Sequence, residues 1–292
     1  MIISNVIGGL GNQMFQYAFG RARSLELGVS LKLDLADFSD YRLHQGFELA
    51  RVFSGEFVEA SEEEVKSILG WRRFAISRRV LAKQVSSRFR GKKLIVEPFS
   101  GYWPGCSQIS DDSYLQGYWQ SDRYFSRHAE IIRRDFAFAA PLEGENLDNA
   151  EQIKKFNSVS VHIRRGDYVT NPKTRAVLQS CQLDYYLAAV DWIRKRVSEP
   201  HFFVFSDDIG WADVNLNLQG NIYFIDNNVG GNSYFDMQLM SLCSHHIIAN
   251  SSFSWWGAWL NPSHKKIVIA PRRWFVDDRD TSSLCPDEWV RL

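Results

Sequence analysis

The residues best suited to chemistry in this chain form the run His162-Ile163-Arg164-Arg165-Gly166-Asp167, which closes an apolar segment of strand length. A guanidinium group is always charged and can bind phosphate oxygens through two parallel hydrogen bonds. A fixed arginine also stabilises the negative charge that develops when a diphosphate departs. The run therefore predicts a diphosphate clamp made by Arg164 and Arg165. The alternative is a structural Arg–Asp pair at a domain interface. This alternative could apply to Arg165 and Asp167 while Arg164 remains functional.

A glycine-rich turn is a second candidate for ligand contact. Gly8-Gly9-Leu10-Gly11 follows an apolar run at residues 2–7, and a helical pattern begins at Asn12. Glycines let a ligand approach the backbone closely, and the N–H groups at a helix start favour an anion. Asn12 and Gln13 could each donate to a phosphate or a sugar hydroxyl. A plain strand-to-helix turn is the alternative, because the segment lacks both the G-x-G-x-x-G pattern and the P-loop lysine.

Paired carboxylates follow another apolar run, in Phe205-Ser206-Asp207-Asp208. They could bind ribose hydroxyls or the edge of a base, although Asp208 is also well placed to cap the next helix. A divalent metal is not expected, because no other acidic cluster is placed to help. The only D-x-D motif, at residues 278–280, follows no recognisable strand and is interpreted as a solvated loop.

The longest candidate stretch runs from Asp236 to Gly257. A helical pattern leads into an apolar strand, and the strand ends in the serine-rich loop Asn250-Ser251-Ser252, which opens another helix. Hydroxyl and N–H groups at such a helix start form an anion site. The methionines before the strand are expected in the core, the adjacent histidines are not expected to bind a metal, and the tryptophan pair is as consistent with packing as with ligand contact.

The elements that must position these loops alternate between short strands and helices. Strands are predicted at 2–7, 30–34, 113–119, 158–163, 201–206, 222–226, 246–249 and 266–270. Helices are predicted from residue 12, from the capping box at 61–64, and at 122–135, 183–198 and 234–244. This alternation indicates βαβ units and parallel sheets. The polar, turn-rich segment 141–149 is predicted to join two doubly wound halves, whose ligands bind at the carboxyl ends of the strands.

Composition places the chain among ordinary globular proteins. It has 292 residues, 45% of them hydrophobic, and 34 basic against 34 acidic residues. The balanced charge gives no argument for nucleic acid as a partner. The four cysteines form no C-x-x-C pair and are expected as reduced thiols. Because there is neither a signal-peptide pattern nor an apolar run of about 18 residues, we expect a cytoplasmic protein.

Three motifs together resemble the bacterial α-1,2-fucosyltransferase family, in order and over almost the whole chain. They are Gly8-Gly9-Leu10-Gly11-Asn12-Gln13-Met14-Phe15-Gln16-Tyr17-Ala18, His162-Ile163-Arg164-Arg165-Gly166-Asp167-Tyr168 and Asn250-Ser251-Ser252-Phe253-Ser254-Trp255-Trp256-Gly257-Ala258-Trp259. The stretch Gln116-Gly117-Tyr118-Trp119-Gln120-Ser121 is similar to that family as well.

The resemblance implies an α/β fold of the GT-B type, with two Rossmann-like domains facing a central cleft. Residues 1–150 would form the acceptor-side domain, and residues 151–292 the domain that binds the GDP-sugar. The implied donor is GDP-β-L-fucose, used without a metal or other cofactor and with inversion at the anomeric carbon. The implied acceptor is a galactose-type residue, joined through an α-1,2 link, in an oligosaccharide or a lipid-linked glycan of the O-antigen or lipopolysaccharide kind.

By resemblance to related fucosyltransferases, Arg164 would bind the β-phosphate and the leaving oxygen, and His162 would lie near the guanosine. Asp236 would accept from N1–H and N2–H of guanine, a donor pair that adenine lacks. The residues predicted to bind the donor are Gly11, Asn12, Arg165, Asp207, Asp236, Ser251, Ser252 and Phe253. The residues predicted to act in catalysis are His162, Arg164 and Asp167.

The catalytic base is not settled by these motifs. An inverting transfer usually needs a group that takes the proton of the acceptor hydroxyl. Some relatives carry a glutamate well downstream of the H-x-R-R motif, but residues 169–175 contain no carboxylate. Asp167 is the leading candidate. A looser path in which the diphosphate itself takes the proton needs no base.

A basic segment at 71–93 is not explained by the resemblance. It holds Arg72, Arg73, Arg78, Arg79, Lys83, Arg88, Arg90, Lys92 and Lys93 and no acidic residue. Apolar residues recur there at helical spacing, as in a helix that lies on an anionic membrane surface. The hypothesis is peripheral contact with the inner face of the membrane. The alternative is an amphipathic helix packed on the first domain with a solvated basic face.

Two other functions compete with fucosyl transfer. The motifs recognise GDP more strongly than the sugar, so a related GDP-deoxysugar or another linkage is the first alternative. A sugar-nucleotide-binding regulator or a lectin is the second. A lectin has no use for the pair of arginines at 164 and 165, which argues for an enzyme.

Overall fold

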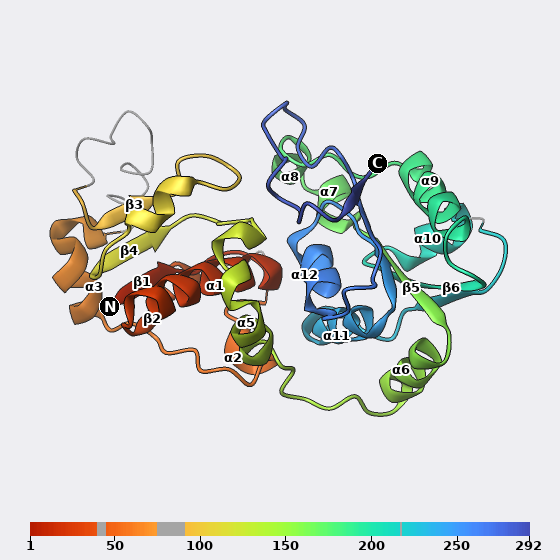
Figure 1. Cartoon of the computed structure of the whole chain (residues 1–292), viewed down its shortest axis with the longest axis horizontal. Helices are drawn as coiled ribbons and strands as arrows, with labels where there is room; N and C mark the ends of the chain where they lie inside the picture. The colour runs from red at the N-terminus through yellow and green to blue at the C-terminus, as the bar shows by residue number, and fades with distance from the viewer. Residues whose placement is uncertain (40–44, 75–90, 217) are drawn as a thin grey trace. The chain divides into compact units, whose positions relative to one another are not determined.

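The computed structural model describes residues 1–39, 45–74, 91–216 and 218–292. The chain forms two compact units (Figure 1). Unit 1 comprises Met1–Ala139 and Ser282–Pro286, and unit 2 comprises Ala140–Thr281 and Asp287–Leu292. The domain boundary expected at residues 150 and 151 falls inside a helix of unit 2, α6 (Glu145–Lys155).

Unit 1 is built on a four-stranded parallel sheet with strand order β2-β1-β4-β3. The strands are β1 (Ile2–Asn5), β2 (Leu31–Asp34), β3 (Leu94–Val96) and β4 (Ser113–Gln116). The helices are α1 (Leu10–Leu27), α2 (Leu49–Val52), α3 (Glu62–Leu69) and α5 (Ala129–Asp135). Parallel neighbours need crossover connections, and α1 supplies the one between β1 and β2.

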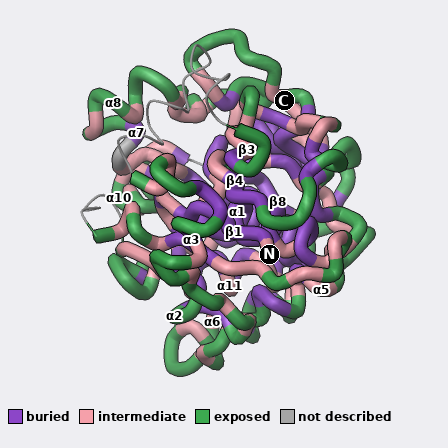
Figure 2. Tube along the Cα trace, turned by 90° about the vertical axis from the view of Figure 1, so that its left-hand side faces the viewer, coloured by how far each residue is buried: buried purple, intermediate pink, exposed green. Residues whose placement is uncertain are grey.

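Helix α1 is the buried centre of unit 1. Met14 and Phe19 are fully buried, and the buried part of the chain runs through α1, β1 and β4 (Figure 2). A Cβ on Gly20 would lie 2.8 Å from Leu31 Cδ1 and 3.2 Å from Ser4 Cβ, so glycine lets the helix lie this close to the sheet without displacing its neighbours. The helix ends at Gly28, whose φ of 66° is the left-handed conformation that a glycine C-cap adopts readily.

Unit 2 is built on a six-stranded parallel sheet with strand order β10-β9-β8-β5-β6-β7. The strands are β5 (Asn157–Ile163), β6 (Pro200–Ser206), β7 (Ile222–Ile225), β8 (His245–Ile247), β9 (Val268–Ala270) and β10 (Val290–Arg291). Besides α6, the helices are α7 (Gly166–Thr170), α8 (Pro172–Arg175), α9 (Leu183–Arg194), α10 (Ile209–Asn215), α11 (Tyr234–Leu242) and α12 (Ser252–Leu260).

The central strand β5 is buried on both faces. Val159, Val161 and Ile163 join the hydrophobic core that contains buried residues of α9. The alternate positions carry polar groups, and His162 is one of them. A strand covered on both faces is typical of a parallel sheet. The same alternation sends His162 to the face opposite α9.

Both sheets reverse their winding direction once. The chain passes from β5 through β6 and β7 and then returns to β8 on the other side of β5. In unit 1 the reversal lies between β1 and β4. Ligands of open α/β sheets bind outside the carboxyl ends of the strands at such switch points. These two edges are therefore where the fold offers ligand sites.

Two elements differ from their sequence predictions. The segment 141–149, predicted as an irregular junction, contains the start of α6. Glu145 and Asp148 lie in the first turn, where their negative charges stabilise the helix by interacting with the positive end of its dipole. The predicted helix at 122–135 is helical as α5 only from Ala129, after two short 3₁₀ turns. Tyr124, in the first of these turns, packs on Phe19, so tertiary contacts override the helical pattern there.

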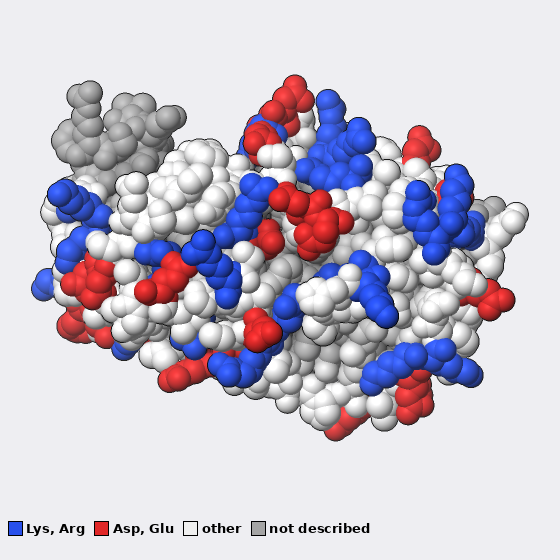
Figure 3. All heavy atoms as spheres, in the orientation of Figure 1, with Lys and Arg blue, Asp and Glu red and all other residues white. Residues whose placement is uncertain are grey.

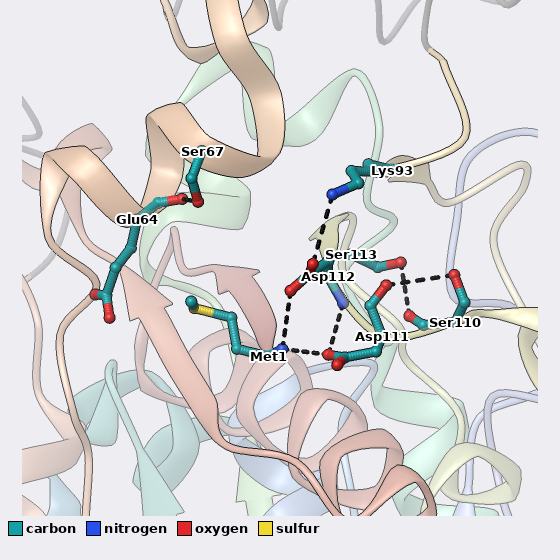
Figure 4. A network of polar contacts seen from close by, with 8 residues as sticks. All are labelled: Met1, Glu64, Ser67, Lys93, Ser110, Asp111, Asp112 and Ser113. Carbon is teal, nitrogen blue, oxygen red and sulfur yellow. Dashed lines mark hydrogen bonds and ion pairs between the residues drawn. The ribbon is translucent and has the colours of Figure 1, made fainter.

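A network of ion pairs lies at the amino edge of the unit 1 sheet (Figure 4). The Met1 amine, ahead of β1, forms ion pairs with Asp111 and Asp112, ahead of β4. Lys93, ahead of β3, lies 3.6 Å from Asp112. None of the predicted site residues lies in this network.

Within the described ranges, no helix has both the length and the apolar character needed to cross a membrane. Most of the basic segment at 71–93 lies outside the described residues, so its predicted membrane contact stays a prediction. Just before the gap, Trp71 and Phe74 are exposed, and Arg72 and Arg73 lie over their rings. On the face shown in Figure 3, acidic and basic side chains are interspersed.

Candidate active site

Arg164 lies just beyond β5, at the carboxyl edge of the unit 2 sheet. Its Nη1 atom is 2.9 Å from Oδ2 of Asp207, which follows β6, and its side chain is 28% exposed. The guanidinium carbon is 5.9 Å from the centre of the Tyr168 ring. Arg164 is thus held in place while part of its charge reaches solvent, as a phosphate clamp requires.

Arg165 has different surroundings. Its Nε donates to Asp208 over 3.1 Å, and its guanidinium lies 3.9 Å from the centre of the Trp211 ring. Asp208 also caps α10 by accepting the N–H of Trp211. The structural Arg–Asp pair that sequence offered as an alternative for Arg165 therefore exists, but with Asp208. The predicted support of the diphosphate by Arg165 stays a prediction.

Asp207 joins the ends of β5 and β6. Besides pairing with Arg164, it accepts the backbone N–H of Arg165 over 2.8 Å. A Cβ on Gly166 would lie 2.6 Å from Asp207 Oδ2, so this close approach requires glycine. The carboxylate is thus engaged in orienting the arginine run. Its predicted contact with the donor stays a prediction.

His162 is buried at the end of β5, with its ring centre 5.6 Å from that of Phe253 on α12. Burial lowers the pKa of His162, and the nearby Arg164 charge adds to this while Asp207 opposes it. The imidazole is therefore neutral at physiological pH. Its Nδ1 is buried and finds no hydrogen-bond partner among the described residues.

The serine-rich loop joins β8 to α12 across the switch point from β5. Ser251 is the N-cap of α12, but its side chain makes no capping hydrogen bond. The first N–H groups of a helix have no partner within the helix and attract anions. Ser251, Ser252 and Phe253 stand at this helix start. Their predicted contacts with the diphosphate stay predictions. Asn250 fixes the loop: its amide donates to Gln179 and Trp274 carbonyls over 2.7 and 2.9 Å.

Asp236 lies in the first turn of α11 and is 9% exposed. Its Oδ1 accepts from Asn228 Nδ2 over 2.8 Å, and Asn228 in turn bonds Asn146 of α6. Burial raises the pKa of Asp236 to about 7, although the hydrogen bond from Asn228 opposes the shift. Such a carboxylate gains strongly from a ligand that offers N–H groups.

The glycine-rich turn of unit 1 corrects one expectation. Gln13 does not present its amide to a ligand, because its Nε2 donates to the carbonyls of Gly8 and Gly46 and its Oε1 accepts from Glu48 N–H. Asn12 is half-buried and accepts from Gln120 over 2.8 Å. Gly11 is buried in the first turn of α1. Donor contacts of Asn12 and Gly11 stay predictions.

The side chain of Asp167 lies outside the described residues, so its proposed role as base stays a prediction. Among the residues that are described, no group of three or more His, Cys, Asp or Glu side chains is arranged to hold a metal ion.

The structure gathers most of the predicted donor residues at one edge of unit 2. Sequence patterns pointed to the strand ends and to the α12 start, because those loops carry the diagnostic residue types. They did not single out Asn228 and Asn146 beside Asp236. Isolated asparagines at such separations have no periodicity or spacing that marks them.

Known proteins resemble this chain over most or all of its length. The family described as Glycosyl transferase family 11 matches residues 1–292. The chain is 37% identical to an alpha-1,2-colitosyltransferase of Escherichia coli, covering 100% of this chain and 99% of that protein. It is 33% identical to the O-antigen biosynthesis glycosyltransferase WbnK of Escherichia coli, covering 98% of each. It is 28% identical to human galactoside alpha-(1,2)-fucosyltransferase 1 over 64% of this chain and 53% of that protein.

The fold has solved counterparts. Fucosyltransferase NodZ from Bradyrhizobium superposes with a TM-score of 0.53 at 14% identity, over 89% of this chain and 93% of that chain. Together with the two parallel α/β units, this confirms the predicted GT-B-type class. The chain belongs to glycosyl transferase family 11, as the resemblance of its motifs predicted, and is a glycosyltransferase.

Proposed function

We propose that the protein transfers L-fucose from GDP-β-L-fucose to the 2-hydroxyl of a galactose-type residue, with inversion and without a metal. One observation carries the proposal. Arg164 stands at the end of β5, and the uncapped start of α12 stands at the end of β8, its neighbour across the switch point. A guanidinium and a helix N-terminus that flank such a point form a diphosphate site.

The chemistry follows from that site. The acceptor oxygen forms a bond to the anomeric carbon, and its proton passes to a base. The bond between that carbon and the β-phosphate oxygen breaks, and its electron pair leaves with GDP. Arg164 and the α12 N–H groups neutralise the charge that grows on the departing diphosphate. In many transferases a divalent cation performs this task, but here the protein's own positive groups supply it.

The position of Asp236 supports guanine as the nucleobase of the donor. A carboxylate accepts from N1–H and N2–H together, which adenine cannot offer as a pair. Asn228 holds one oxygen of Asp236 and so fixes the direction of the carboxylate. NodZ, the fold counterpart, has been co-crystallised with GDP and soaked with GDP-fucose.

Colitose is the second candidate for the transferred sugar, because the colitosyltransferase matches the whole chain at 37% identity. Colitose is fucose without its 3-hydroxyl. A site that hydrogen-bonds this hydroxyl rejects the deoxy sugar strongly. A site that makes no hydrogen bond to it accepts both sugars. The ratio of kcat/KM for GDP-fucose and GDP-colitose with one β-galactoside therefore tests the donor. A ratio above about 100 supports fucose, and a ratio below 1 replaces fucose by colitose.

The acceptor is proposed to be a galactose-containing bacterial surface glycan. The similarity to WbnK, a glycosyltransferase of O-antigen biosynthesis, supports this class of acceptor. The name of the human relative, a galactoside fucosyltransferase, supports galactose as the residue that is modified.

A further inference from the structure

A glutamate that sequence patterns did not single out lies at the carboxyl edge of the unit 1 sheet. Glu97 directly follows β3, and its backbone N–H donates to the Gln116 carbonyl at the end of β4 over 2.9 Å. Its carboxylate accepts the backbone N–H groups of Tyr118 and Trp119, over 2.7 and 3.0 Å. These two bonds fix the direction of the carboxylate, and each oxygen keeps a lone pair for a further donor.

The backbone around Glu97 is shaped for this contact. A Cβ on Gly117 would lie 2.4 Å from Glu97 Cβ and 2.8 Å from Glu97 Oε2, so only glycine fits beside the carboxylate. Trp119 has a φ of 55°, the left-handed region that bulky residues rarely adopt. Strained conformations of this kind persist where the surroundings enforce them and cluster at ligand sites.

Glu97 is half-buried, and the described residues supply no compensating cation. In the part of the chain that the structure describes, no lysine or arginine forms an ion pair with it. Burial raises the pKa of Glu97 to about 7, although the backbone N–H groups of Tyr118 and Trp119 oppose the shift. A half-buried carboxylate with no counter-ion costs stability, and such groups are concentrated at functional sites.

The surroundings of Glu97 suit a neutral sugar. Tyr118 and Phe99 are large aromatic side chains that are 45% and 54% exposed. Trp119 Nε1 and Gln116 Oε1 are buried and find no hydrogen-bond partner among the described residues. A pyranose offers an apolar face to aromatic rings and hydroxyls to polar groups, whereas a phosphate would be repelled by the carboxylate.

We propose that Glu97, Gln116 and Tyr118 form the subsite for the acceptor sugar, and that Glu97 is the base that activates its hydroxyl. The inference rests on the proposed function. The acceptor O–H bond breaks and its proton passes to the Glu97 carboxylate. The oxygen's electron pair forms the bond to the anomeric carbon, and the bond to the diphosphate breaks with its electrons leaving on GDP. Glu97 then returns the proton to solvent.

The test compares Glu97→Gln with a control variant of unit 1. The control also replaces a carboxylate, but it is expected to change only the stability of the protein. Asp135→Asn serves as that control, because Asp135 is buried and bonded to Tyr17 and Arg21. Turnover is measured with methyl β-galactoside at saturating GDP-fucose, so that donor binding does not enter the pH profile. We expect Glu97→Gln to lower kcat at least about 100-fold. The KM for GDP-fucose, measured separately with the donor concentration varied, should stay unchanged.

The pH profile distinguishes a catalytic role of Glu97 from a purely structural role, in which the carboxylate only binds the backbone N–H groups of Tyr118 and Trp119. A base must be deprotonated, so wild-type kcat/KM for the acceptor should fall as pH drops through about 7, and Glu97→Gln should lose this limb. Asp135→Asn should keep the limb while its Tm falls. Tyr118→Ala should raise the acceptor KM with little change in kcat. The inference is overturned if Glu97→Gln keeps near-normal kcat, or if Asp167→Asn removes the limb and Glu97→Gln does not.

A binding measurement keeps the inference separate from the proposed function. Saturation-transfer NMR of methyl β-galactoside on the GDP-loaded protein needs no turnover. Binding by the wild type that Tyr118→Ala and Glu97→Gln both weaken supports the subsite, even if another donor sugar is the true one. Equal binding by all three proteins rejects the subsite.

Discussion

Arg164 and Arg165 are neighbours with the same charge, yet their surroundings differ. Arg164 pairs with Asp207 at the strand edge, whereas Arg165 is fixed between Asp208 and the Trp211 ring. The type and spacing of these residues predicted a phosphate site from the sequence. The difference in their contacts could not be predicted, because it depends on two aspartates that strand pairing brings alongside.

This difference predicts unequal effects of lysine at the two positions. Lysine keeps the charge but loses the planar fork that binds two phosphate oxygens. Arg164→Lys should lower kcat/KM for GDP-fucose about 100-fold with little change in Tm. Arg165→Lys should lower Tm by a few degrees, because it loses the stacking on Trp211, and should change kcat/KM much less. Equal losses of activity in both variants would contradict the assignment.

Asp236 predicts a proton release on donor binding. With a pKa of about 7, roughly half of the free protein carries this proton at pH 7. Guanine N1–H and N2–H require the carboxylate form, so binding of GDP-fucose at pH 7 should release about half a proton and weaken as pH falls.

Calorimetric titration in buffers of different ionisation enthalpy measures this release. GDP-fucose is the proper ligand, because its diphosphate has no group that titrates near neutrality, whereas GDP has one. Asp236→Asn should bind more weakly and release no proton. A release that persists in Asp236→Asn would place the titrating group elsewhere.

At the scale of elements, the proposed diphosphate site depends on how α12 packs against α11. Gly257 lies in α12, and a Cβ there would lie 2.8 Å from Met240 Cε and 3.1 Å from Met240 Cβ on α11. Close contact of the two helices sets the place where α12 begins, and therefore where its N–H groups point.

Gly257→Ala should lower the free energy of unfolding of unit 2 by about 1–3 kcal/mol and raise the Kd for GDP-fucose. Gly210→Ala in α10 is the matched control, because no atom lies within 4 Å of a Cβ built there. Urea unfolding and donor titration measure both effects. If Gly257→Ala behaves like Gly210→Ala, the contact between α11 and α12 does not set the site.

The elements themselves were largely predictable where apolar periodicity was strong. Strands β5 and β6 fall within one residue of their predicted bounds, because parallel strands buried on both faces are continuous apolar runs. The short edge strand β3 was missed, since three residues leave too little pattern. Glu97, which follows β3, was missed with it. The 3₁₀ turns before α5 were missed because aromatic packing, not local propensity, decides them.

At the scale of the whole molecule, one fold principle accounts for both proposed sites. Each unit has a parallel sheet that reverses its winding once, and the reactive side chains gather at the carboxyl edge of that sheet. Unit 2 offers cationic and N–H groups suited to a diphosphate, and unit 1 offers a carboxylate with aromatic rings suited to a sugar. The proposed donor and acceptor roles rest on this difference in chemistry between the two edges.

The most direct test of the central claim is the linkage of the product formed from GDP-fucose and a β-galactoside in the presence of EDTA. The wild-type protein should release GDP and form an α-1,2-linked fucoside at a rate that EDTA does not change. The product's anomeric and linkage signals in NMR decide the outcome. Loss of turnover in EDTA that Mg²⁺ or Mn²⁺ restores, or a product with another linkage, would contradict the account.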